Sequence, residues 1–395
     1  MNFVFISPNF PQIYSHFVKS LKDRGVNVLG IGDEPYGLLN DELKANLTEY
    51  CFVSDLSRLD WMKNTIDYLT YKYGHIDFIE SNNEFWLMSD AELRKFANTT
   101  TGMWPEEMDK IKYKSKMKEY FIKAGVKVAR YILVTDLNHS LEFVKQVGYP
   151  VFAKPDNGVG AAETYKIKND EDLINFHNTH PDEPYIMEEF LDGYIVSFDG
   201  ICDENSEVTK CVMETFPKPI AEVVKEDSDV YYYAQSKMPK DHEKRGKAVI
   251  KSFGIKQRCF HIEFFVLKSD KEGLGKKGDF IGLEVNMRSP GGFTPSLISI
   301  AWQASYFDLY ADMIVGKKDD NSKPNDYIAI AVSRKDRFQY VRSHEEIMNK
   351  YGWLIKVYGH YPKAYATAMG DHFYYGEFDN LEDALKFKDY IQEQK

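Results

Sequence analysis

The first hundred residues alternate short apolar runs with stretches of helical periodicity. Four apolar runs predict strands, at residues 3–6, 26–31, 51–53 and 76–80. Apolar spacing predicts helices over residues 13–24 and 60–73, and Gly25 is a natural stop for the first. Because strands that alternate with helices usually pair in parallel, we expect an open parallel α/β domain. Ligands of such sheets bind at the carboxyl ends of the strands, here at residues 7–11 and 81–84.

The rest of the chain divides into a second helix–strand stretch, a strand-rich stretch and a tail. A basic amphipathic helix is predicted over residues 109–124, closed by Gly125. The elements expected next are a strand at 131–134, a helix at 141–147 and a strand at 151–154. Long strands rich in Ile, Val and Phe are expected from residue 185 onward. The tail is expected to contain strands at 327–333 and 364–368 and a helix at 381–393.

The composition fits a globular enzyme and narrows the range of its partners. Of the 395 residues, 43% are hydrophobic and 28% are charged, and the formal net charge is −11. Because a nucleic-acid binder normally carries a basic face, this balance argues against such a partner. No run of about 18 apolar residues predicts a membrane span, and the first residues are interpreted as a strand rather than a signal peptide.

The cysteines favour a reducing compartment. The chain has four of them, Cys51, Cys202, Cys211 and Cys259, and none forms a Cys-x-x-Cys pair. Unpaired thiols are typical of the cytoplasm, which is therefore the expected location.

The clearest chemical signal is an alternating strand pattern at residues 280–288. Its period of two puts Glu284, Asn286 and Arg288 on one face. The residues expected on the other, buried face are Ile281, Leu283, Val285 and Met287. A turn with two glycines follows at residues 289–292, so a positive charge stands beside flexible backbone.

The preceding strand pattern, at residues 260–266, puts His261 and Glu263 on one face. If the two strands pair as a hairpin, Glu263 stands beside Glu284 and Asn286. Two carboxylates and an amide oxygen form a hard-oxygen site of the kind that Mg²⁺ prefers. A solvated strand face is the simpler alternative, but it explains the charged, glycine-containing turn less well. His261 is either a substrate contact or base, or a packed strand histidine.

A lysine before a glycine loop is the second signal. Lys154 ends an apolar strand and is followed by Gly158 and Gly160. A lysine in this position can hold phosphate oxygens while backbone N–H groups close over them. The loop is not a Walker A motif, because no Gly-Lys-Ser/Thr opens a helix, and a two-glycine loop alone is usually a simple turn.

A third segment, residues 185–193, runs from an apolar strand into two acids and then into Leu191 and a glycine. The acids are Glu188 and Glu189. Such a segment can form a hinge between domains. The backbone groups of that hinge can then hydrogen-bond to the amino edge of adenine. Taken alone, the acids would more often mark a simple strand end.

In their order along the chain, these signals resemble the motifs of the ATP-grasp superfamily. The resemblance rests on Lys114 with Gly125 downstream, Lys154 with its glycine loop, residues 188–191, Glu263, and residues 284–288. It implies a multidomain α/β and α+β fold, with an open parallel pre-ATP-grasp domain followed by a two-lobed ATP-grasp module. The expected divisions are a pre-ATP-grasp domain at 1–103, a small lobe at 104–184, a central lobe at 185–316 and a C-terminal α+β subdomain at 317–395.

The resemblance also implies roles for particular residues. Those implied in ATP binding are Lys114, Lys154, Gly158, Gly160, Glu188, Glu189 and Leu191. The two lysines would contact the phosphates, the glycines would lie in the loop that covers them, and the last three would line the adenine pocket, Glu189 and Leu191 mainly through backbone atoms. The residues implied in binding one or two Mg²⁺ ions are Glu263, Glu284 and Asn286. Arg288 would lie at the reacting carboxylate.

The implied activity is that of an ATP- and Mg²⁺-dependent ligase. A carboxylate attacks the γ-phosphoryl group to give an acyl phosphate, and an amine, or as the second alternative a thiol, then displaces phosphate. Residues 286–292 are most similar to those of carboxylate–amine ligases, including amino-acid ligases. The expected partners are small-molecule carboxylate and amine substrates, with no nucleic acid and no membrane, and a homodimer is left open.

Two alternatives remain within this resemblance. Biotin carboxylases share the Glu-x-Asn-x-Arg pattern but continue with Gln-Val-Glu-His, where this chain has Ser289-Pro290-Gly291-Gly292. A non-catalytic nucleotide-binding protein is disfavoured because the set of metal ligands is complete. A dinucleotide-dependent oxidoreductase would need a Gly-x-Gly-x-x-Gly after the first strand, and residues 7–11 lack it.

Overall fold

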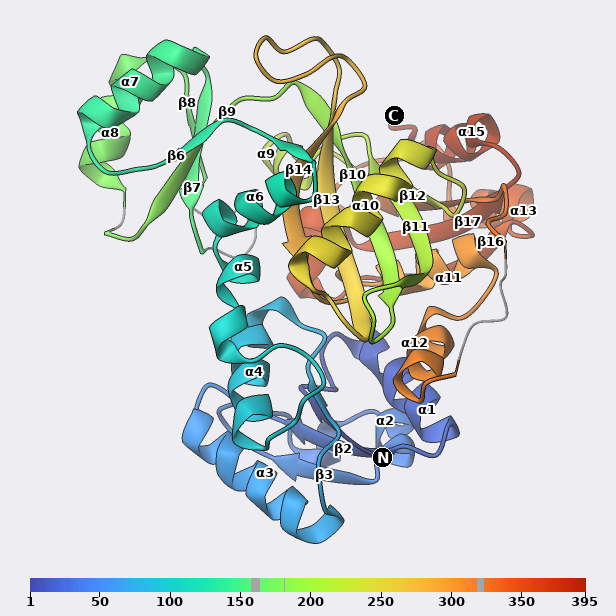
Figure 1. Cartoon of the computed structure of the whole chain (residues 1–395). Helices are drawn as coiled ribbons and strands as arrows, with labels where there is room; N and C mark the ends of the chain where they lie inside the picture. Colours follow the sequence, from blue (N-terminus) through green and yellow to red (C-terminus); the bar gives the residue numbers. More distant parts are fainter. Residues whose placement is uncertain (158–163, 181, 318–322) are drawn as a thin grey trace.

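The N-terminal part of the chain is a parallel sheet, as the strand–helix alternation predicted. The computed structural model describes residues 1–157, 164–180, 182–317 and 323–395. The strand order is β3-β2-β1-β4, and each neighbouring pair is parallel. The strands are β1 (Asn2–Ile6), β2 (Asn27–Gly32), β3 (Glu49–Phe52) and β4 (Phe78–Glu80). The helices are α1 (Ser15–Asp23), α2 (Asp41–Asn46), α3 (Leu59–Tyr73) and α4 (Leu87–Phe96), drawn with the sheet at the bottom of Figure 1.

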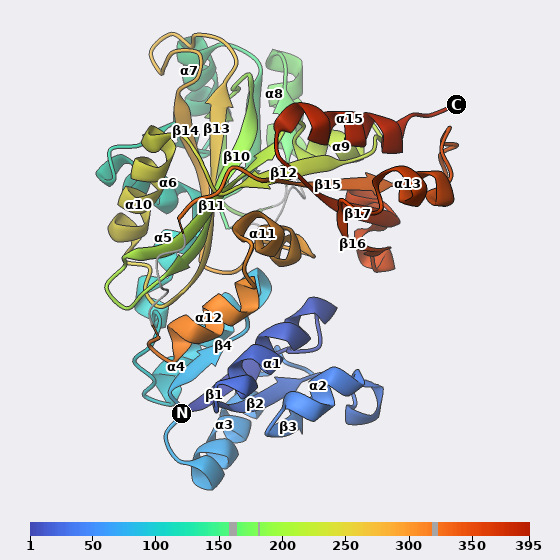
Figure 2. The same ribbon diagram turned by 90° about the vertical axis from the view of Figure 1, so that its right-hand side faces the viewer.

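Alternate residues of β1 face two separate cores. Phe3 and Phe5 belong to a cluster with residues of α1 and of α12 (Tyr306–Ile314), whereas Val4 and Ile6 belong to a cluster with residues of α3. A strand covered on both faces is apolar throughout, which explains the continuous apolar run in the sequence. The contact between α1 and α12, visible in Figure 2, attaches this domain to the rest of the molecule.

A small antiparallel sheet with two helices forms a lobe at the upper left of Figure 1. Its strand order is β6-β9-β7-β8. The strands are β6 (Tyr131–Leu133), β7 (Val151–Pro155), β8 (Tyr165–Ile167) and β9 (Tyr185–Glu189), and the helices are α7 (Leu137–Val147) and α8 (Asp170–Thr179). Both helices start at side-chain caps, because Asp136 and Asn169 accept backbone N–H groups of the first turn.

The predicted helix over residues 109–124 is wrong in one respect, because it is broken at Tyr113. The structure has α5 (Asp109–Lys112) and α6 (Lys114–Lys123), and Tyr113 between them is extended. The break lets the start of α6 bond to the strand end of the small lobe. Lys114 donates its backbone N–H to the carbonyl of Asp156 at 2.8 Å, and Ser115 donates its own to the Asp156 carboxylate at 2.7 Å. These tertiary bonds replace those of a continuous helix.

A nine-stranded sheet forms the body of the molecule, and strands of the tail belong to it. Its order is β16-β17-β15-β12-β11-β10-β13-β14-β5. The strands are β5 (Lys127–Val128), β10 (Gly193–Cys202), β11 (Val208–Phe216), β12 (Tyr231–Gln235), β13 (Arg258–Leu267), β14 (Phe280–Asn286), β15 (Ile328–Arg334), β16 (Ile355–His360) and β17 (His372–Phe378). The long strands expected after residue 185 are therefore present, and neighbouring strands bring side chains of distant segments into one row.

Helices cover this sheet and the tail. The α-helices, besides α12, are α9 (Ile220–Lys225), α10 (Lys240–Phe253), α11 (Thr294–Trp302), α13 (His344–Tyr351), α14 (Ala366–Met369) and α15 (Leu381–Gln392). Short 3-10 helices occur at Gln12–Tyr14, Tyr36–Leu38, Glu84–Trp86, Pro105–Glu107 and Lys363–Tyr365. The strand predicted at residues 364–368 is wrong, since this segment is helical. It contains three alanines, which favour helix over strand.

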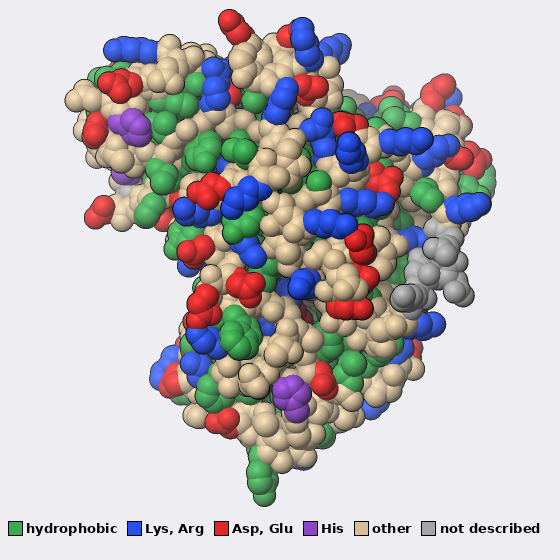
Figure 3. Space-filling view, in the orientation of Figure 1, with side chains coloured by type: hydrophobic (Ala, Val, Ile, Leu, Met, Phe, Trp, Pro, Cys, Tyr) green, Lys and Arg blue, Asp and Glu red, His purple; other side chains and the backbone are tan. Residues whose placement is uncertain are grey.

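Acidic and basic side chains are interspersed on the face seen in Figure 3. Within the described parts of the chain, no helix combines the length and the apolar character that crossing a membrane requires.

Candidate active site

Two neighbouring strands bring the predicted oxygen ligands together. β13 and β14 are antiparallel, with Glu263 opposite Glu284 and His261 opposite Asn286. Burial raises the pKa of Glu284, and the charge of Glu263 adds to this effect against the opposing charge of Lys114. Two facing carboxylates and an amide oxygen on one rigid surface suit a divalent cation that prefers oxygen. The residues present therefore fit Mg²⁺.

The strict alternation predicted for residues 280–288 fails at a β-bulge. The register shifts between Glu263 and Phe264, so that Leu283 is the extra residue of β14. Val285 packs in one core cluster, whereas Ile281 packs in another with Leu191. Leu283 is only partly buried. The expectation that Ile281, Leu283 and Val285 share one buried face is therefore wrong.

A close packing contact lies next to the bulge. Gly282 lies against Phe121 of α6, and a Cβ at Gly282 would stand 2.5 Å from the Phe121 ring. The absence of a side chain at this position allows α6 to lie close to the sheet. This close approach brings Lys114 and its neighbours on α6 beside Glu284.

Glu188 is held between two lysines rather than at an open pocket wall. Lys154 Nζ lies 2.7 Å from Glu188 Oε2, and Lys118 Nζ pairs with Glu188 Oε1. Burial opposes ionisation of Glu188, but the charges of Lys118 and Lys154 outweigh it and lower its pKa to about 2. Lys114 Nζ in turn lies 3.7 Å from Glu284 Oε1. Three lysines therefore stand around the acids, where a polyphosphate would find positive charge.

The side chain of Glu189 points to a different partner. Its carboxylate accepts the backbone N–H of Arg130 at 2.8 Å and an Nη2 bond from the same residue at 2.6 Å. Leu191 is 8% exposed and packs with Ala129, Leu267 and Ile281. Since both side chains are occupied in packing or in an ion pair, a ligand at this segment would meet its backbone. The predicted loop glycines, Gly158 and Gly160, lie outside the described residues.

Arg288 is paired with an acid of the N-terminal domain. Its Nη2 donates to Glu84 Oε2 at 2.5 Å, and its Nη1 donates to the Ser289 carbonyl at 2.9 Å. Glu84 belongs to the strand-end segment 81–84 that the parallel sheet marked as a ligand edge. Tyr14 lies near the same arginine, and burial raises the pKa of the Tyr14 hydroxyl to about 12. Sequence reasoning did not connect Glu84 or Tyr14 with Arg288.

A cavity of about 50 Å³ lies where the N-terminal domain meets the helices leading to the small lobe. Its lining includes Glu84, Lys112, Met117, Asn157 and Glu284. One metal-ligand candidate, Glu284, therefore faces the same space as Glu84, the partner of Arg288, and Asn157, the residue before the predicted glycine loop.

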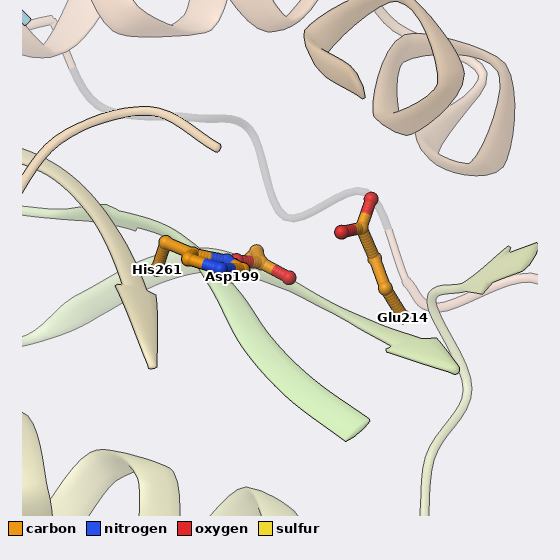
Figure 4. Close-up of side chains that lie close together, drawn as sticks. All are labelled: Asp199, Glu214 and His261. Carbon is orange, nitrogen blue, oxygen red and sulfur yellow. The ribbon is translucent and has the colours of Figure 1, made fainter. Parts of the chain in front are cut away.

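Toward β10 and β11 of the same sheet lies a buried trio that the sequence analysis did not combine. Figure 4 shows Asp199, Glu214 and His261, from β10, β11 and β13, with ligating atoms within 4.8 Å of one another. His261 Nδ1 bonds to Asp199 Oδ1, and its Nε2 lies 3.2 Å from Glu263 Oε1. Burial lowers the pKa of His261, but Asp199 and Glu263 outweigh this and raise it well above its usual range.

The sequence contained usable signals for two kinds of missed residue. Lys118 follows Lys114 by four positions, and that spacing puts both on one face of a helix. Asp199 and Glu214 are polar residues within long apolar strands, which is a signal for a site when the strands are buried. Which strands neighbour each other, and hence the trio itself, is a property of the tertiary structure.

Comparisons with known proteins agree with this architecture. No family model matches the sequence. D-alanine–D-alanine ligase B of Clostridium perfringens is 30% identical over 114 residues, which are 28% of this chain and 33% of that protein. The arginine-specific large chain of mitochondrial carbamoyl phosphate synthase of Neurospora crassa is 25% identical over 118 residues, 29% of this chain and 10% of that protein. The chain thus matches a third or less of the length of these relatives.

Solved structures are similar over nearly the whole chain. The L-amino acid ligase of Bacillus licheniformis has a TM-score of 0.72 at 14% identity and covers 98% of this chain and 95% of its own. The biotin carboxylase domain of the 2-oxoglutarate carboxylase of Hydrogenobacter thermophilus, solved with MgADP and bicarbonate, has a TM-score of 0.70 at 15% identity, with coverages of 97% and 88%. The chain therefore has the ATP-grasp fold, as the order of its motifs predicted. At these identities the likeness concerns the fold.

Proposed function

We propose that this protein is an ATP- and Mg²⁺-dependent ligase that activates a carboxylate as an acyl phosphate and joins it to an amine. In the first step, a bond forms between a carboxylate oxygen and the γ-phosphorus as the bond to the ADP oxygen breaks. In the second, an amine forms the C–N bond and loses a proton, and phosphate leaves. The printed names of the similar proteins include ligases for amino acids and for D-alanine, which supports this class.

One observation carries the proposal. Glu263, Glu284 and Asn286 lie together on the paired strands β13 and β14, with Glu263 opposite Glu284, Asn286 opposite His261 and Lys114 beside Glu284. Glu263 also lies within the electrostatic reach of Arg288 and Lys154. Oxygen ligands, phosphate-binding cations and an arginine for a carboxylate are the groups that phosphoryl transfer to an acid requires.

We propose the following roles for these residues. Lys114 and Lys154 contact the phosphates of ATP, and the carboxylates of Glu263 and Glu284 with the amide of Asn286 hold Mg²⁺, which neutralises phosphate charge when bound. Lys118 joins this set through its ion pair with Glu188. The backbone around Glu189 and Leu191 contacts adenine, and Gly158 and Gly160 belong to the covering loop.

Arg288 binds the reacting carboxylate in this proposal. Its guanidinium is already paired with a carboxylate, that of Glu84. An acid substrate at this position would replace Glu84 as the partner of Arg288. The planar guanidinium of Arg288 favours binding of both carboxylate oxygens at once. Glu84 therefore acts as the resting partner of Arg288.

The proposal also includes the divisions at residues 103, 184 and 316, a cytoplasmic location, and small-molecule substrates without nucleic acid. The four cysteines are free thiols, which supports the location. A homodimer stays open.

A carboxylase is the second candidate, because a biotin carboxylase domain is among the similar structures. The turn Ser289-Pro290-Gly291-Gly292 replaces the stretch that serves carboxylases and disfavours it. The deciding experiment measures ADP release with ATP, Mg²⁺ and a panel of organic acids, with hydroxylamine as the amine. A ligase accumulates hydroxamate and releases ADP only with an acid. ADP release that depends on bicarbonate and biotin would favour the carboxylase, and no acid-dependent release would favour a nucleotide-binding protein without turnover.

A further inference from the structure

Glu214 is a buried carboxylate without a hydrogen-bond donor. Its side chain is 0% exposed, and among the described residues the group that comes within hydrogen-bonding reach of it is another acid, Asp199, rather than an N–H donor. Leaving a buried polar group unpaired costs about 1–3 kcal/mol, and more when the group is charged. A native structure therefore keeps such a group for a reason.

The neighbours of Glu214 are themselves already bonded. Asp199 receives the hydroxyl of Ser197 on one oxygen and the His261 Nδ1 on the other. His261 uses its second nitrogen on Glu263. The charge of Asp199 also opposes ionisation of Glu214. No donor within this cluster is left over for Glu214, and the region carries more acid than base.

The residues that face Glu214 across the sheet have short side chains. In the sheet it stands opposite Ser197 of β10 and opposite Ala234 of β12, so both cross-strand neighbours are small. Larger residues at these two positions would cover the carboxylate. A ligand with hydrogen-bond donors at Glu214 would therefore meet only short side chains at these two positions.

A metal ion fits this cluster poorly. Both ring nitrogens of His261 are already hydrogen-bonded to carboxylates, those of Asp199 and Glu263, so a metal ion at this trio would have to displace one of these bonds. A primary ammonium group supplies up to three N–H donors and a positive charge, which match the oxygens of Glu214 and the acidic surroundings.

The position of Glu214 relates it to the reacting end of the site. Glu214 pairs across the sheet with Ser197, Ser197 with Glu263, and Glu263 with Glu284. The row therefore runs from Glu214 to the proposed magnesium ligands. A small molecule on it can have one end at Glu214 and its carboxylate near Arg288.

We propose that Glu214, supported by Asp199, binds the ammonium group of the acid that this enzyme activates, so that this acid is an amino acid. The inference rests on the proposed ligase function. An ammonium held by a buried carboxylate keeps its proton and cannot attack the acyl phosphate. The amine of the activated acid is thereby distinguished from the amine that accepts the acyl group.

The experiment measures hydroxamate formation with matched acids. Each amino acid is compared with the acid that lacks only its amino group, such as alanine with propanoate, phenylalanine with 3-phenylpropanoate, and 6-aminohexanoate with hexanoate. At least one amino acid is expected to exceed its partner in kcat/KM by about 100-fold, the effect of losing a hydrogen-bonded charge pair. Glu214→Gln should remove this preference by lowering kcat/KM for the amino acid about 100-fold. The rate with the des-amino acid should stay within about twofold.

Controls separate this inference from the function on which it rests. Glu207→Gln, on the exposed turn before β11 where Glu207 pairs with Lys251, should retain the full preference. Equal rates of hydroxamate formation from amino acids and des-amino acids would overturn the inference and leave the ligase function intact. Unchanged kinetics of Glu214→Gln would have the same consequence. That result would mark Glu214 as a carboxyl that shares a proton with Asp199.

Thermal shift supplies a readout independent of turnover. An amino acid with a non-hydrolysable ATP analogue and Mg²⁺ should raise the Tm of the wild type but not that of Glu214→Gln. If no acid yields hydroxamate, the ligase function fails, and absence of this Tm difference then overturns the inference as well. A Tm rise with Zn²⁺ or Mn²⁺ alone, lost in Glu214→Gln, would overturn it in favour of a metal site.

Discussion

Two buried glutamates on the two sides of the active site illustrate opposite electrostatic solutions. Glu188 is 6% exposed and is paired with Lys118 and Lys154. Glu214 is 0% exposed and lies beside another acid, Asp199, and beside His261, which Asp199 and Glu263 already engage. Burial opposes ionisation in both, but the pKa of Glu188 is lowered and that of Glu214 is raised.

The difference shows where the protein supplies counter-charge and where it does not. At Glu188 the lysines already balance the acid, so their remaining charge is held in fixed positions for phosphates. At Glu214 the nearby basic group, His261, is already shared between Asp199 and Glu263, so a ligand can supply further positive charge. The comparison therefore assigns the first glutamate to positioning and the second to binding.

The largest expected effect comes from removing the charge of Glu188, which is paired with lysines. Glu188→Gln leaves the buried Lys118 without its carboxylate, and removing one partner of a buried ion pair costs about 3–5 kcal/mol. Urea unfolding followed by circular dichroism measures this loss of unfolding free energy. Glu214→Gln, measured alongside, should lose less than about 1 kcal/mol at neutral pH because it removes no ion pair. Equal losses in the two variants would contradict the comparison.

The second prediction concerns Arg288, whose balancing acid comes from another domain. Arg288→Lys should lower the rate of hydroxamate formation about 100- to 1000-fold, because lysine lacks the planar fork that holds a carboxylate. The affinity for ATP should stay nearly unchanged, which equilibrium binding of a labelled nucleotide measures. Unchanged hydroxamate formation would show that Arg288 does not hold the reacting group.

The third prediction uses pH to sharpen the contrast. The pKa of Glu188 falls from 4.5 to about 2 on folding, so its ionic contribution of about 3 kcal/mol is present above about pH 4.5 and is lost as the pH falls toward 2. The difference in unfolding free energy between the wild type and Glu188→Gln should therefore shrink on acidification.

Glu214 should show the opposite sign in the same titration. Because its folded pKa is raised, its stabilising contribution is complete below about pH 4.5 and is lost as the pH rises through the raised value. The wild type should accordingly lose stability relative to Glu214→Gln as the pH increases. Differences of the same sign for both glutamates would refute the assignment of opposite shifts.

The smallest expected effect comes from removing one of the two lysines that pair with Glu188. Lys154→Ala should weaken ATP binding about 10- to 100-fold, the value of a hydrogen bond to a charged group. Binding of adenosine should change little, because adenosine has no phosphates. Isothermal titration calorimetry with both ligands tests this, and equal losses would remove Lys154 from the phosphate site.

Local patterns predicted much of the fold correctly. Period-two alternation gave β13 and β14, and antiparallel pairing put Glu263 opposite Glu284. Strand–helix alternation gave the parallel N-terminal sheet. The type of each element follows from the pattern within one chain segment, whereas the pairing was inferred from general rules for neighbouring strands. The errors arose where distant contacts intervened, as at Tyr113, where bonds to Asp156 divide the helix.

The sequence by itself determined the type of chemistry, because carboxylates, lysines, an amide and an arginine stand at strand ends in an order that resembles one superfamily. Tertiary structure alone decided which of these groups balance each other. Lys118 of α6 pairs with Glu188 of β9, and Arg288 pairs with Glu84, which follows the N-terminal parallel sheet. Glu214 lies beside Asp199 and His261. The energy of a buried charge depends on its neighbours within a few ångströms. Those neighbours come from segments far apart in the sequence, so only the folded chain fixes them.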